Sequence, residues 1–356
     1  MQELGASDLE TLSLGATLLG SGGGGDPAIL YALLHYWLEK TGPIRILQSE
    51  ALPPQALVIP LALIGAPLIS LERLPNSTMF MQLLAALEDS YPGRDLVLMP
   101  AEIGGCNALT PLMLAAQTAL PVLDADLIGR AFPKLHMAKP AVNGKNHQIS
   151  FMASPFGAVE RFETHSLACL EAQARELAVH YGGSALIASF LFSGEEQADY
   201  IIPGSLRRAL NWGQLLQLHS QDRRGFALAT QARRLGAGLL TEVRHTLEDG
   251  FLTGYAELQM PAGSLRVYFQ NEYLLVSQRE GGQERSLAAS PELITLIETR
   301  SGLPLTSESL RYGLKVEIFS LPAPDFWMEP RAYAQVNLAA FGLDKCIGDV
   351  NVYIRH

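Results

Sequence analysis

The feature that most constrains the fold is a nearly continuous apolar run at residues 56–64 of the 356-residue chain, interrupted by Pro60. Such a run is typical of a strand that is buried on both faces of a sheet, and the proline favours an edge position or a bulge. Further strands are predicted at 95–99 and 121–123, separated by helical patterns at 78–89 and 109–119. This strand–helix–strand spacing implies parallel pairing with right-handed crossovers, so the first half predicts an α/β domain.

The second half of the chain has a different pattern. A helical pattern at 166–181 links the halves, and a second helix is predicted at 205–218, after the turn Pro203-Gly204. Beyond Gly236 the sequence predicts short strands at 253–259, 264–270, 272–278 and 315–320. Turn signals recur roughly every ten residues, which favours an antiparallel barrel or sandwich. We therefore predict two domains, residues 1–165 and 166–356, with a boundary that the sequence alone restricts only to 160–235.

Composition and charge exclude several classes of protein. Lys and Arg number 26 against 36 Asp and Glu, giving a net charge of −10, and no basic block stands out for binding nucleic acid. The N-terminus lacks the basic region of a signal peptide, and the longest apolar stretch, residues 57–71, is too short to cross a bilayer. Three cysteines far apart in the sequence indicate neither a disulfide framework nor a zinc site. We expect a cytoplasmic protein that binds neither membranes nor nucleic acid.

A glycine-rich segment, residues 20–26 (the glycine loop), stands between two helical patterns. Gly20, Gly22 and Gly25 fit the dinucleotide fingerprint, but that fingerprint needs a preceding strand, and a nucleotide P-loop needs a Gly-Lys-Ser/Thr ending that is missing here. The loop is therefore a hinge or tight turn, or else a site where main-chain amides bind an anionic oxygen at a helix N-terminus. The candidate ligand-binding residues are Gly22, Gly23, Gly24 and Gly25, and Asp26 is expected to cap the next helix.

Two further loops follow predicted strands, at the sheet edge where open α/β sheets bind ligands. Gly65-Ala66-Pro67 offers a wall with little side chain, or is a simple turn. The segment 102–107 contains Glu102, Gly104, Gly105 and Asn107, of which the asparagine is either a ligand contact or a helix cap. Cys106 is a candidate nucleophile only if a base lies beside it.

Asp124, Asp126 and Arg130 form the densest charged cluster after a predicted strand. Residues two apart on an extended segment point the same way, so the two carboxylates are able to share a metal or a proton. Arg130 is expected to pair with one of them and leave the other free, or to clamp a substrate carboxylate. A structural salt bridge that closes the loop remains the alternative. His136 follows closely enough to reach the same cleft.

The order of several longer motifs resembles the S-methyl thiohydantoin desulfurase family. The first half contains LLGSGGGGDP, GAP, AEIGGCNALTPL and PVLDADLIGRAFPKL, and the second contains IPGSLRRALNWG, FQNEYLL, PELITLIE and LRYGLKVEIFSLPAPDFW. The resemblance implies an N-terminal three-layer α/β domain with a largely parallel sheet and a C-terminal β-barrel-like domain. Matching positions are Gly22 to Asp26, Glu102, Gly104, Gly105, Asn107, Asp124, Asp126, Gly129 and Arg130. The chain departs from the family pattern at Cys106 and at residues 337–343.

The resemblance also implies an activity, the hydrolytic removal of sulfur from a thiohydantoin ring to give a hydantoin, with related cyclic amides as further substrates. Such hydrolysis needs an activated water and stabilisation of the resulting anion. Asp124, Asp126 and Glu102 are the catalytic candidates, one aspartate serving as base with or without a divalent metal. Asn107 would hold the ring with Glu102, and Arg130 or the glycine loop would receive charge. A non-catalytic ligand-binding or regulatory protein and a nucleotide-dependent enzyme remain alternatives, and we expect a homo-oligomer. All these assignments require the loops to share one cavity.

Overall fold

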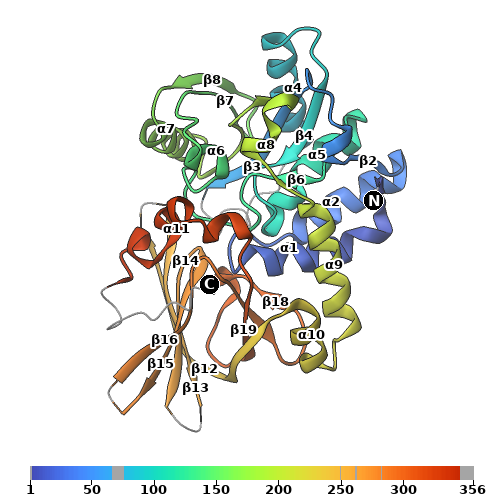
Figure 1. Ribbon diagram of the computed structural model, residues 1–356. Coiled ribbons are helices and arrows are strands. Elements are labelled where there is room, and N and C mark those ends of the chain that lie inside the picture. Colours follow the sequence, from blue (N-terminus) through green and yellow to red (C-terminus); the bar gives the residue numbers. More distant parts are fainter. Residues whose placement is uncertain (1, 66–75, 249, 261–262, 282, 345–356) are drawn as a thin grey trace.

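The computed structural model describes residues 2–65, 76–248, 250–260, 263–281 and 283–344, and these form two large sheets and one small two-stranded sheet, with helices around and between them (Figure 1). Ala66 and Pro67, named above, lie outside the described residues, as does Cys346, one of the three cysteines. The first sheet has the strand order β1-β2-β5-β4-β3-β9-β7-β8, with β10 pairing at one end of β3. Its strands are β1 (Glu3–Leu4), β2 (Ile44–Leu47), β3 (Leu57–Gly65), β4 (Leu96–Pro100), β5 (Val122–Leu123), β7 (Gln148–Ala153), β8 (Val159–Thr164), β9 (Ser184–Ala188) and β10 (Phe192–Ser193).

The parallel character of this sheet is confined to its centre. β2, β5, β4 and β3 run parallel to one another, whereas β9, β7 and β8 continue the sheet antiparallel from β3. The sheet is therefore parallel, as expected, in the strand–helix–strand segment on which that expectation was based. The antiparallel strands after residue 147 were not predicted. β9 also lies beyond the expected domain boundary at 165 and 166, so the segment after that boundary still builds the first sheet.

Helices cover both faces of the first sheet, which makes three layers. The buried side chains of β3 alternate, with Leu57 and Ile59 in one core and Val58 and Ile64 in the other. The first core is covered by helices α1 (Leu9–Gly20), α2 (Ala28–Thr41), α4 (Ser77–Ser90) and α5 (Thr110–Thr118). The second is covered by α7 (Leu167–His180) and α11 (Pro330–Val336), near the short helices α6 (Lys139–Val142) and α8 (Gln197–Tyr200).

The edge or bulge position expected for Pro60 is wrong, because β3 is central in the sheet. On one side β3 pairs with β4 over residues 57–61. On the other side β10 pairs with residues 57–58 and β9 pairs with residues 61–65. Pro60 lies at the change from one partner to the next, where the missing N–H interrupts no ladder. A central strand therefore accommodates the proline without losing a ladder hydrogen bond.

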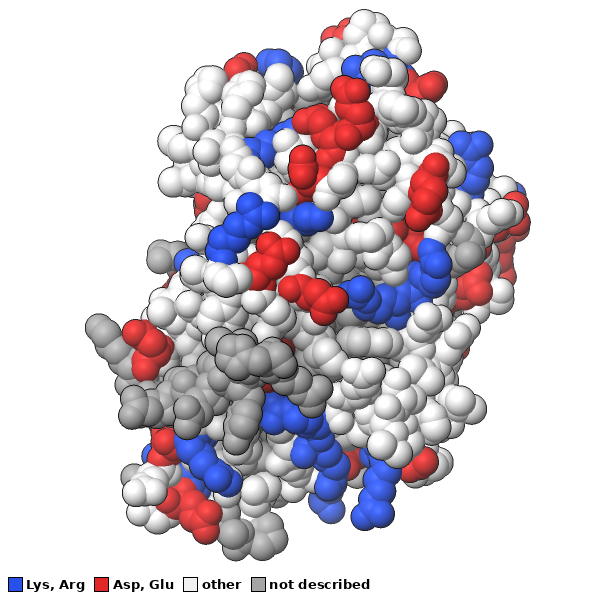
Figure 2. Space-filling view, in the orientation of Figure 1, with Lys and Arg blue, Asp and Glu red and all other residues white. Residues whose placement is uncertain are grey.

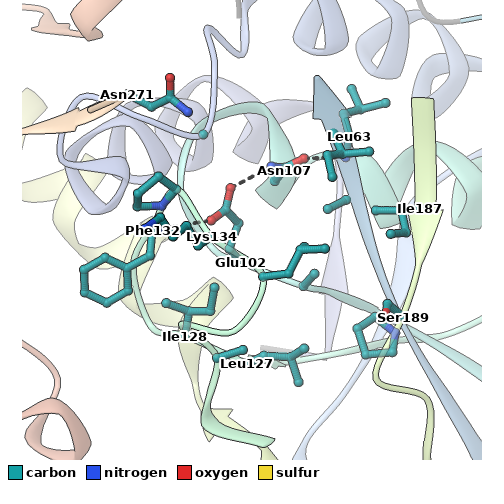
Figure 3. Close-up of a pocket in the computed structure, with 18 of the residues that line it drawn as sticks. Leu63, Glu102, Asn107, Leu127, Ile128, Phe132, Lys134, Ile187, Ser189 and Asn271 are labelled. Atoms are coloured by element: carbon teal, nitrogen blue, oxygen red, sulfur yellow. Dashed lines mark hydrogen bonds between the residues drawn. The ribbon is translucent and has the colours of Figure 1, made fainter. Parts of the chain in front are cut away.

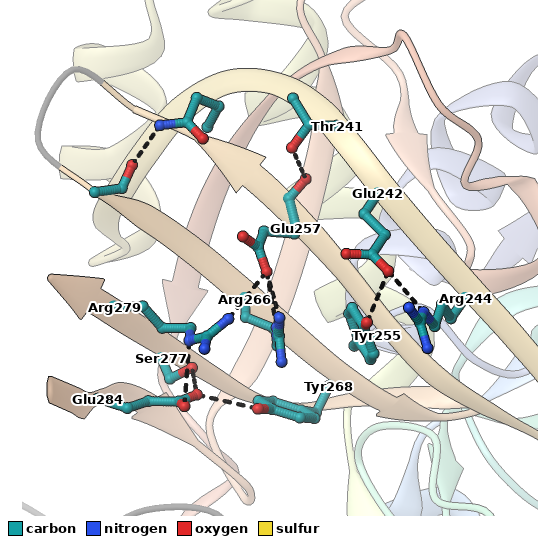
Figure 4. A network of polar contacts seen from close by, with 12 residues as sticks. Thr241, Glu242, Arg244, Tyr255, Glu257, Arg266, Tyr268, Ser277, Arg279 and Glu284 are labelled. Atoms are coloured by element: carbon teal, nitrogen blue, oxygen red, sulfur yellow. Dashed lines mark hydrogen bonds and ion pairs between the residues drawn. The ribbon is translucent and has the colours of Figure 1, made fainter. Parts of the chain in front are cut away.

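The second domain is an antiparallel eight-stranded sheet with the order β16-β15-β14-β13-β12-β19-β17-β18. Its strands are β12 (Arg233–Glu248), β13 (Phe251–Gln259), β14 (Ser264–Gln270), β15 (Glu272–Glu280), β16 (Gln283–Ala289), β17 (Leu293–Glu298), β18 (Pro304–Leu305) and β19 (Lys315–Leu321). In the described ranges no pairing joins β16 to β18, so the sheet is open and the barrel-like closure is not confirmed. One face carries a network of polar side chains in which the half-buried Arg266 donates to Glu257 at 2.5 Å (Figure 4).

The two domains are joined through the end of α1 and through α9 (Ser205–Leu218), which is followed by α10 (Arg223–Thr230). α1 and α9 approach so closely that a Cβ on Gly15 would lie 1.7 Å from the carbonyl oxygen of Ala209. Ser21, just past α1, exchanges hydrogen bonds of 2.9 and 3.0 Å with the main chain of Ile294 in β17. Because the glycine loop begins at this joint, its position is fixed by the second domain.

The outer surface carries mixed charge. On the face that Figure 2 shows, acidic and basic side chains alternate over both domains. Of the helices that the structure describes, none combines the length and the apolar character needed to traverse a lipid bilayer.

Candidate functional site between the two domains

A pocket lies between the first sheet and the second domain. It encloses about 1040 Å³ of empty space, part of it open to solvent. The carboxyl ends of β3 and β4 contribute one wall, and the segment 127–138 contributes another. The remaining lining comes from the glycine loop, from β9 and from Asn271 and Glu272 at the start of β15. A ligand in this pocket would therefore contact both domains.

Glu102 contributes a buried carboxyl group to the lining of the pocket (Figure 3). Its carboxylate accepts a 2.7 Å hydrogen bond from Asn107 Nδ2 and a 3.3 Å bond from the main-chain N–H of Phe132. Asn107 is oriented in turn by the N–H of Leu63 in β3, which donates to its Oδ1 at 2.7 Å. Three segments far apart in the sequence thus hold one carboxyl group in a fixed orientation.

The environment of Glu102 raises its pKa from 4.5 to about 7. Burial is the largest cause, since the side chain is 9% exposed and water cannot solvate the charge. The bonds from Asn107 and Phe132 oppose this effect because they favour the ionised form. At neutral pH the carboxyl group is therefore populated in both protonation states, which suits a group that accepts and returns a proton.

The glycine loop packs against the 102–107 segment with no room for side chains. A Cβ on Gly24 would lie 2.3 Å from the carbonyl oxygen of Gly104, and one on Gly105 would lie 2.4 Å from that of Gly25. Gly24 and Gly25 line the pocket, as do Gly65, Glu102 and Asn107. The other predicted glycines, Gly22, Gly23, Gly104 and Gly105, are not among the lining residues. They allow the loops to meet, and Gly22 faces the ring of Tyr273.

Cys106 lines the pocket but lacks the environment of a nucleophile. Its thiol donates a 3.0 Å hydrogen bond to the carbonyl of Gly24. Burial raises the pKa of the thiol, and the negative charge of Glu102 raises it further. The neutral thiol therefore predominates, and its hydrogen bond fixes the glycine loop.

Asp124 and Asp126 lie outside the pocket, so the described structure does not bring the aspartates and Glu102 into one cavity. Asp126 accepts hydrogen bonds from the N–H groups of Ile103, Ile128 and Gly129 at 2.7 to 3.2 Å and from Ser205 Oγ at 2.5 Å. With both oxygens occupied, this carboxylate braces the loop after β6 (Ala125–Asp126), which pairs with β11 (Ile202–Pro203).

Asp124 faces a different surface hollow, where Arg207 of α9 bonds it through Nη2 at 3.2 Å. The expected pairing of Arg130 with one of the aspartates is therefore wrong. The chain turns at Gly129, with φ +75°, and directs Arg130 toward the second domain. There the buried guanidinium donates to the carbonyl oxygens of Ala131, Pro291 and Glu292.

The contribution of the second domain to the pocket was not predicted from the sequence. Asn271 adopts a left-handed conformation, with φ +58°, and exchanges main-chain and side-chain bonds of 2.8 Å with Leu252. This turn presents Glu272 to the pocket. The signal was available, because a polar Asn-Glu pair stands between two apolar strands in the segment FQNEYLL. Lys134 and Arg175, also missed, contribute the positive charges of the lining.

A metal site in the pocket stays a prediction. Among the residues described, one group of three metal-ligating side chains lies close together, namely His147, Glu163 and His165. These side chains are exposed beside β7 and β8 and are not part of the pocket lining. His136 is likewise not among the lining residues.

Comparison with known proteins identifies the family. No curated protein matches the chain. A crystal structure of a protein from Chromobacterium violaceum is similar over 98% of this chain and 99% of that one, with a TM-score of 0.82 and 23% sequence identity, and shares the fold. Family models described as S-Me-THD-like, N-terminal domain, and S-Me-THD-like, C-terminal domain, match residues 7–164 and 165–348. The chain therefore belongs to the S-Me-THD-like family.

Proposed function

We propose that this protein is a hydrolase that removes the sulfur substituent from an S-methyl thiohydantoin or a closely related ring. The observation that carries the proposal is the buried carboxyl group of Glu102, held in a pocket by Asn107 and Phe132 with a pKa of about 7. The family description supports the substrate class. A flat five-membered ring also suits the lining, which is largely apolar and includes Leu63, Ile128 and Ile187 (Figure 3).

The chemistry requires one water molecule and one base. Glu102, as the carboxylate, takes a proton from water while the water oxygen bonds to the ring carbon that carries sulfur. The carbon–sulfur bond then breaks, and the sulfur leaves as a thiol once it has gained a proton. The ring product is the hydroxy-imine tautomer of a hydantoin, which becomes the hydantoin when that hydroxyl proton moves to the ring nitrogen. Water and substrate together account for every atom of the two products.

The test is turnover by the purified protein with S-methyl thiohydantoin as substrate. Methanethiol is followed with a thiol-reactive dye and the hydantoin by mass spectrometry. Glu102→Gln keeps the shape of the side chain but removes the base, and we expect kcat/KM to fall about 100-fold or more. Asp124→Asn is the matched control, because Asp124 lies outside the pocket and its replacement should change kcat/KM less than about threefold.

The outcomes separate the competing assignments. Full activity of Glu102→Gln, with loss in Asp124→Asn or Asp126→Asn, would return the role of base to the aspartates. A wild-type protein that binds the thiohydantoin, as a rise in melting temperature, but releases no thiol would be a non-catalytic binder. A wild-type protein that neither binds nor turns over the ring would remove the proposal.

A further inference from the structure

Glu272 reaches the pocket from the domain opposite Glu102. It is the first residue of β15, directly after the left-handed turn at Asn271, and its side chain is 2% exposed. The carboxyl group packs on the glycine loop, since a Cβ on Gly23 would lie 2.0 Å from Glu272 Oε1. Gly23 thus leaves the space that the carboxyl group fills, and the same side chain lines the pocket.

The polar groups around Glu272 are not fully paired. In the part of the chain that the structure describes, Glu272 Oε2 has no hydrogen-bond partner, and neither has Nη2 of the buried Arg130. Leaving a buried carboxyl oxygen unpaired destabilises the folded state, and more so if the group is charged. An unpaired buried group beside a pocket therefore either has a function there or destabilises the fold without a compensating gain.

Burial and two nearby carboxyl groups favour the acid form of Glu272. Burial raises its pKa well above 4.5, and the negative charges of Glu102 and Glu308 raise it further. Arg130 acts in the opposite direction. The first of these acids, Glu102, has a pKa of about 7. Two buried carboxyl groups that line one pocket from opposite domains are the arrangement expected of an acid and base pair.

We propose that Glu272 is the proton donor to the sulfur that leaves the ring. This assignment rests on the function proposed above and adds a second catalytic residue from the other domain. As the carbon–sulfur bond breaks, its electron pair goes to sulfur and the carboxylic acid of Glu272 gives sulfur its proton. Glu102 holds the proton taken from water at that moment. Transfer of that proton from Glu102 to Glu272 restores both groups, so one water is consumed and one thiol is released.

The other titratable groups near the glycine loop are occupied or placed elsewhere. The Cys106 thiol donates to Gly24, and the hydroxyl of Tyr273 donates to the carbonyl of Leu305 at 3.0 Å. Glu308 is buried beside the loop but is not among the residues that line the pocket. Of the described acids, this leaves Glu102 and Glu272 as the two that line the cavity.

The dependence of kcat/KM on the leaving group tests the proposed role of Glu272. A methyl thiolate is a poor leaving group and needs protonation, whereas an aryl thiolate leaves without it. For Glu272→Gln we expect kcat/KM with the S-methyl ring to fall about 100-fold or more, and with an S-phenyl ring to fall less than about tenfold. Asp124→Asn is the matched control, because it removes a buried acid outside the pocket, and it should affect both substrates equally and less than about threefold.

Four results would overturn the role of Glu272. Equal losses with both rings would mark it as structural, as would loss of hydantoin binding measured by calorimetry. Unchanged kcat/KM in a variant that melts as the wild type does would show that sulfur gains its proton elsewhere. If the wild-type protein releases no thiol from either ring, the proposed function itself fails and the role of Glu272 fails with it. The wild-type chain is inactive only in that last case, which distinguishes a failure of the proposed function from a failure of the role of Glu272 alone.

Discussion

Replacing Glu102 by glutamine should change how the stability of the protein depends on pH. The folded protein holds this carboxyl group with a pKa of about 7, against 4.5 in the unfolded chain. The folded state therefore binds the proton more tightly, and this contribution to stability is complete below the unfolded value and lost as pH rises through the folded one. Each unit of pKa corresponds to about 1.4 kcal/mol. The free energy of unfolding therefore falls by about 3 kcal/mol as pH rises from below the unfolded pKa to above the folded one.

A glutamine at position 102 does not ionise, so the variant lacks this loss. It also loses one hydrogen bond, because Asn107 Nδ2 and the N–H of Phe132 both donate to residue 102 and a glutamine side chain has one acceptor oxygen. That loss costs about 1 kcal/mol and is the same at every pH. The free energy of unfolding of the wild type minus that of Glu102→Gln should therefore fall by about 3 kcal/mol between about pH 4 and about pH 8.

Urea unfolding followed by circular dichroism at several pH values measures this difference. The other buried acids titrate in both proteins and cancel, apart from Glu272, which interacts with Glu102 directly. Glu308→Gln is a suitable reference for the size of this pH dependence, because the pKa of Glu308 is also raised to about 7 and Glu308 lies outside the pocket. A difference between wild type and Glu102→Gln that stays level across the range would refute the assigned environment of the carboxyl group.

Two further predictions concern the glycine loop and the thiols. Gly24→Ala and Gly144→Ala both place a side chain at positive φ, but only at Gly24 would the new Cβ meet an atom within 4 Å, the carbonyl oxygen of Gly104 at 2.3 Å. Chemical denaturation should therefore show that Gly24→Ala costs about 2 kcal/mol more than Gly144→Ala, and equal costs would contradict the packing. Iodoacetamide should label the exposed Cys169 in the native protein and the buried Cys106 only after unfolding, as read by peptide mass spectrometry. Native labelling of Cys106 at the rate of Cys169 would disprove its burial.

The periodic parts of the fold could be predicted from the sequence. The helix expected at 205–218 and the strand expected at 264–270 have those bounds in the structure. Strand β8, with charged residues at half of its positions, gives no apolar run to detect, and its place depends on pairing with β7. The position of Pro60 could not be predicted for a similar reason, since it depends on where two partner strands meet.

The candidate site was predicted in part because its loops follow strands that run parallel. Glu102 and Asn107 come directly after β4, and sheet geometry alone brings them to the pocket. Arg130 failed because its direction depends on the turn at Gly129, which no pairwise spacing reveals. Glu272 was missed because Glu102 lies 170 residues earlier in the chain, a separation across which the sequence pattern carries no information.

The seam between the domains has a consequence for any shortened form of the protein. A chain that stopped before Asn271 would still contain the first sheet and Glu102, but the glycine loop would lose its hydrogen bonds to Tyr273 and Ile294. The cavity would then open to water along one side, and the protonation of Glu102 would return toward that of a carboxyl group in solution. The last strands therefore complete the wall of the pocket and thereby set the pKa of Glu102, so a chain that lacks them has an incomplete site.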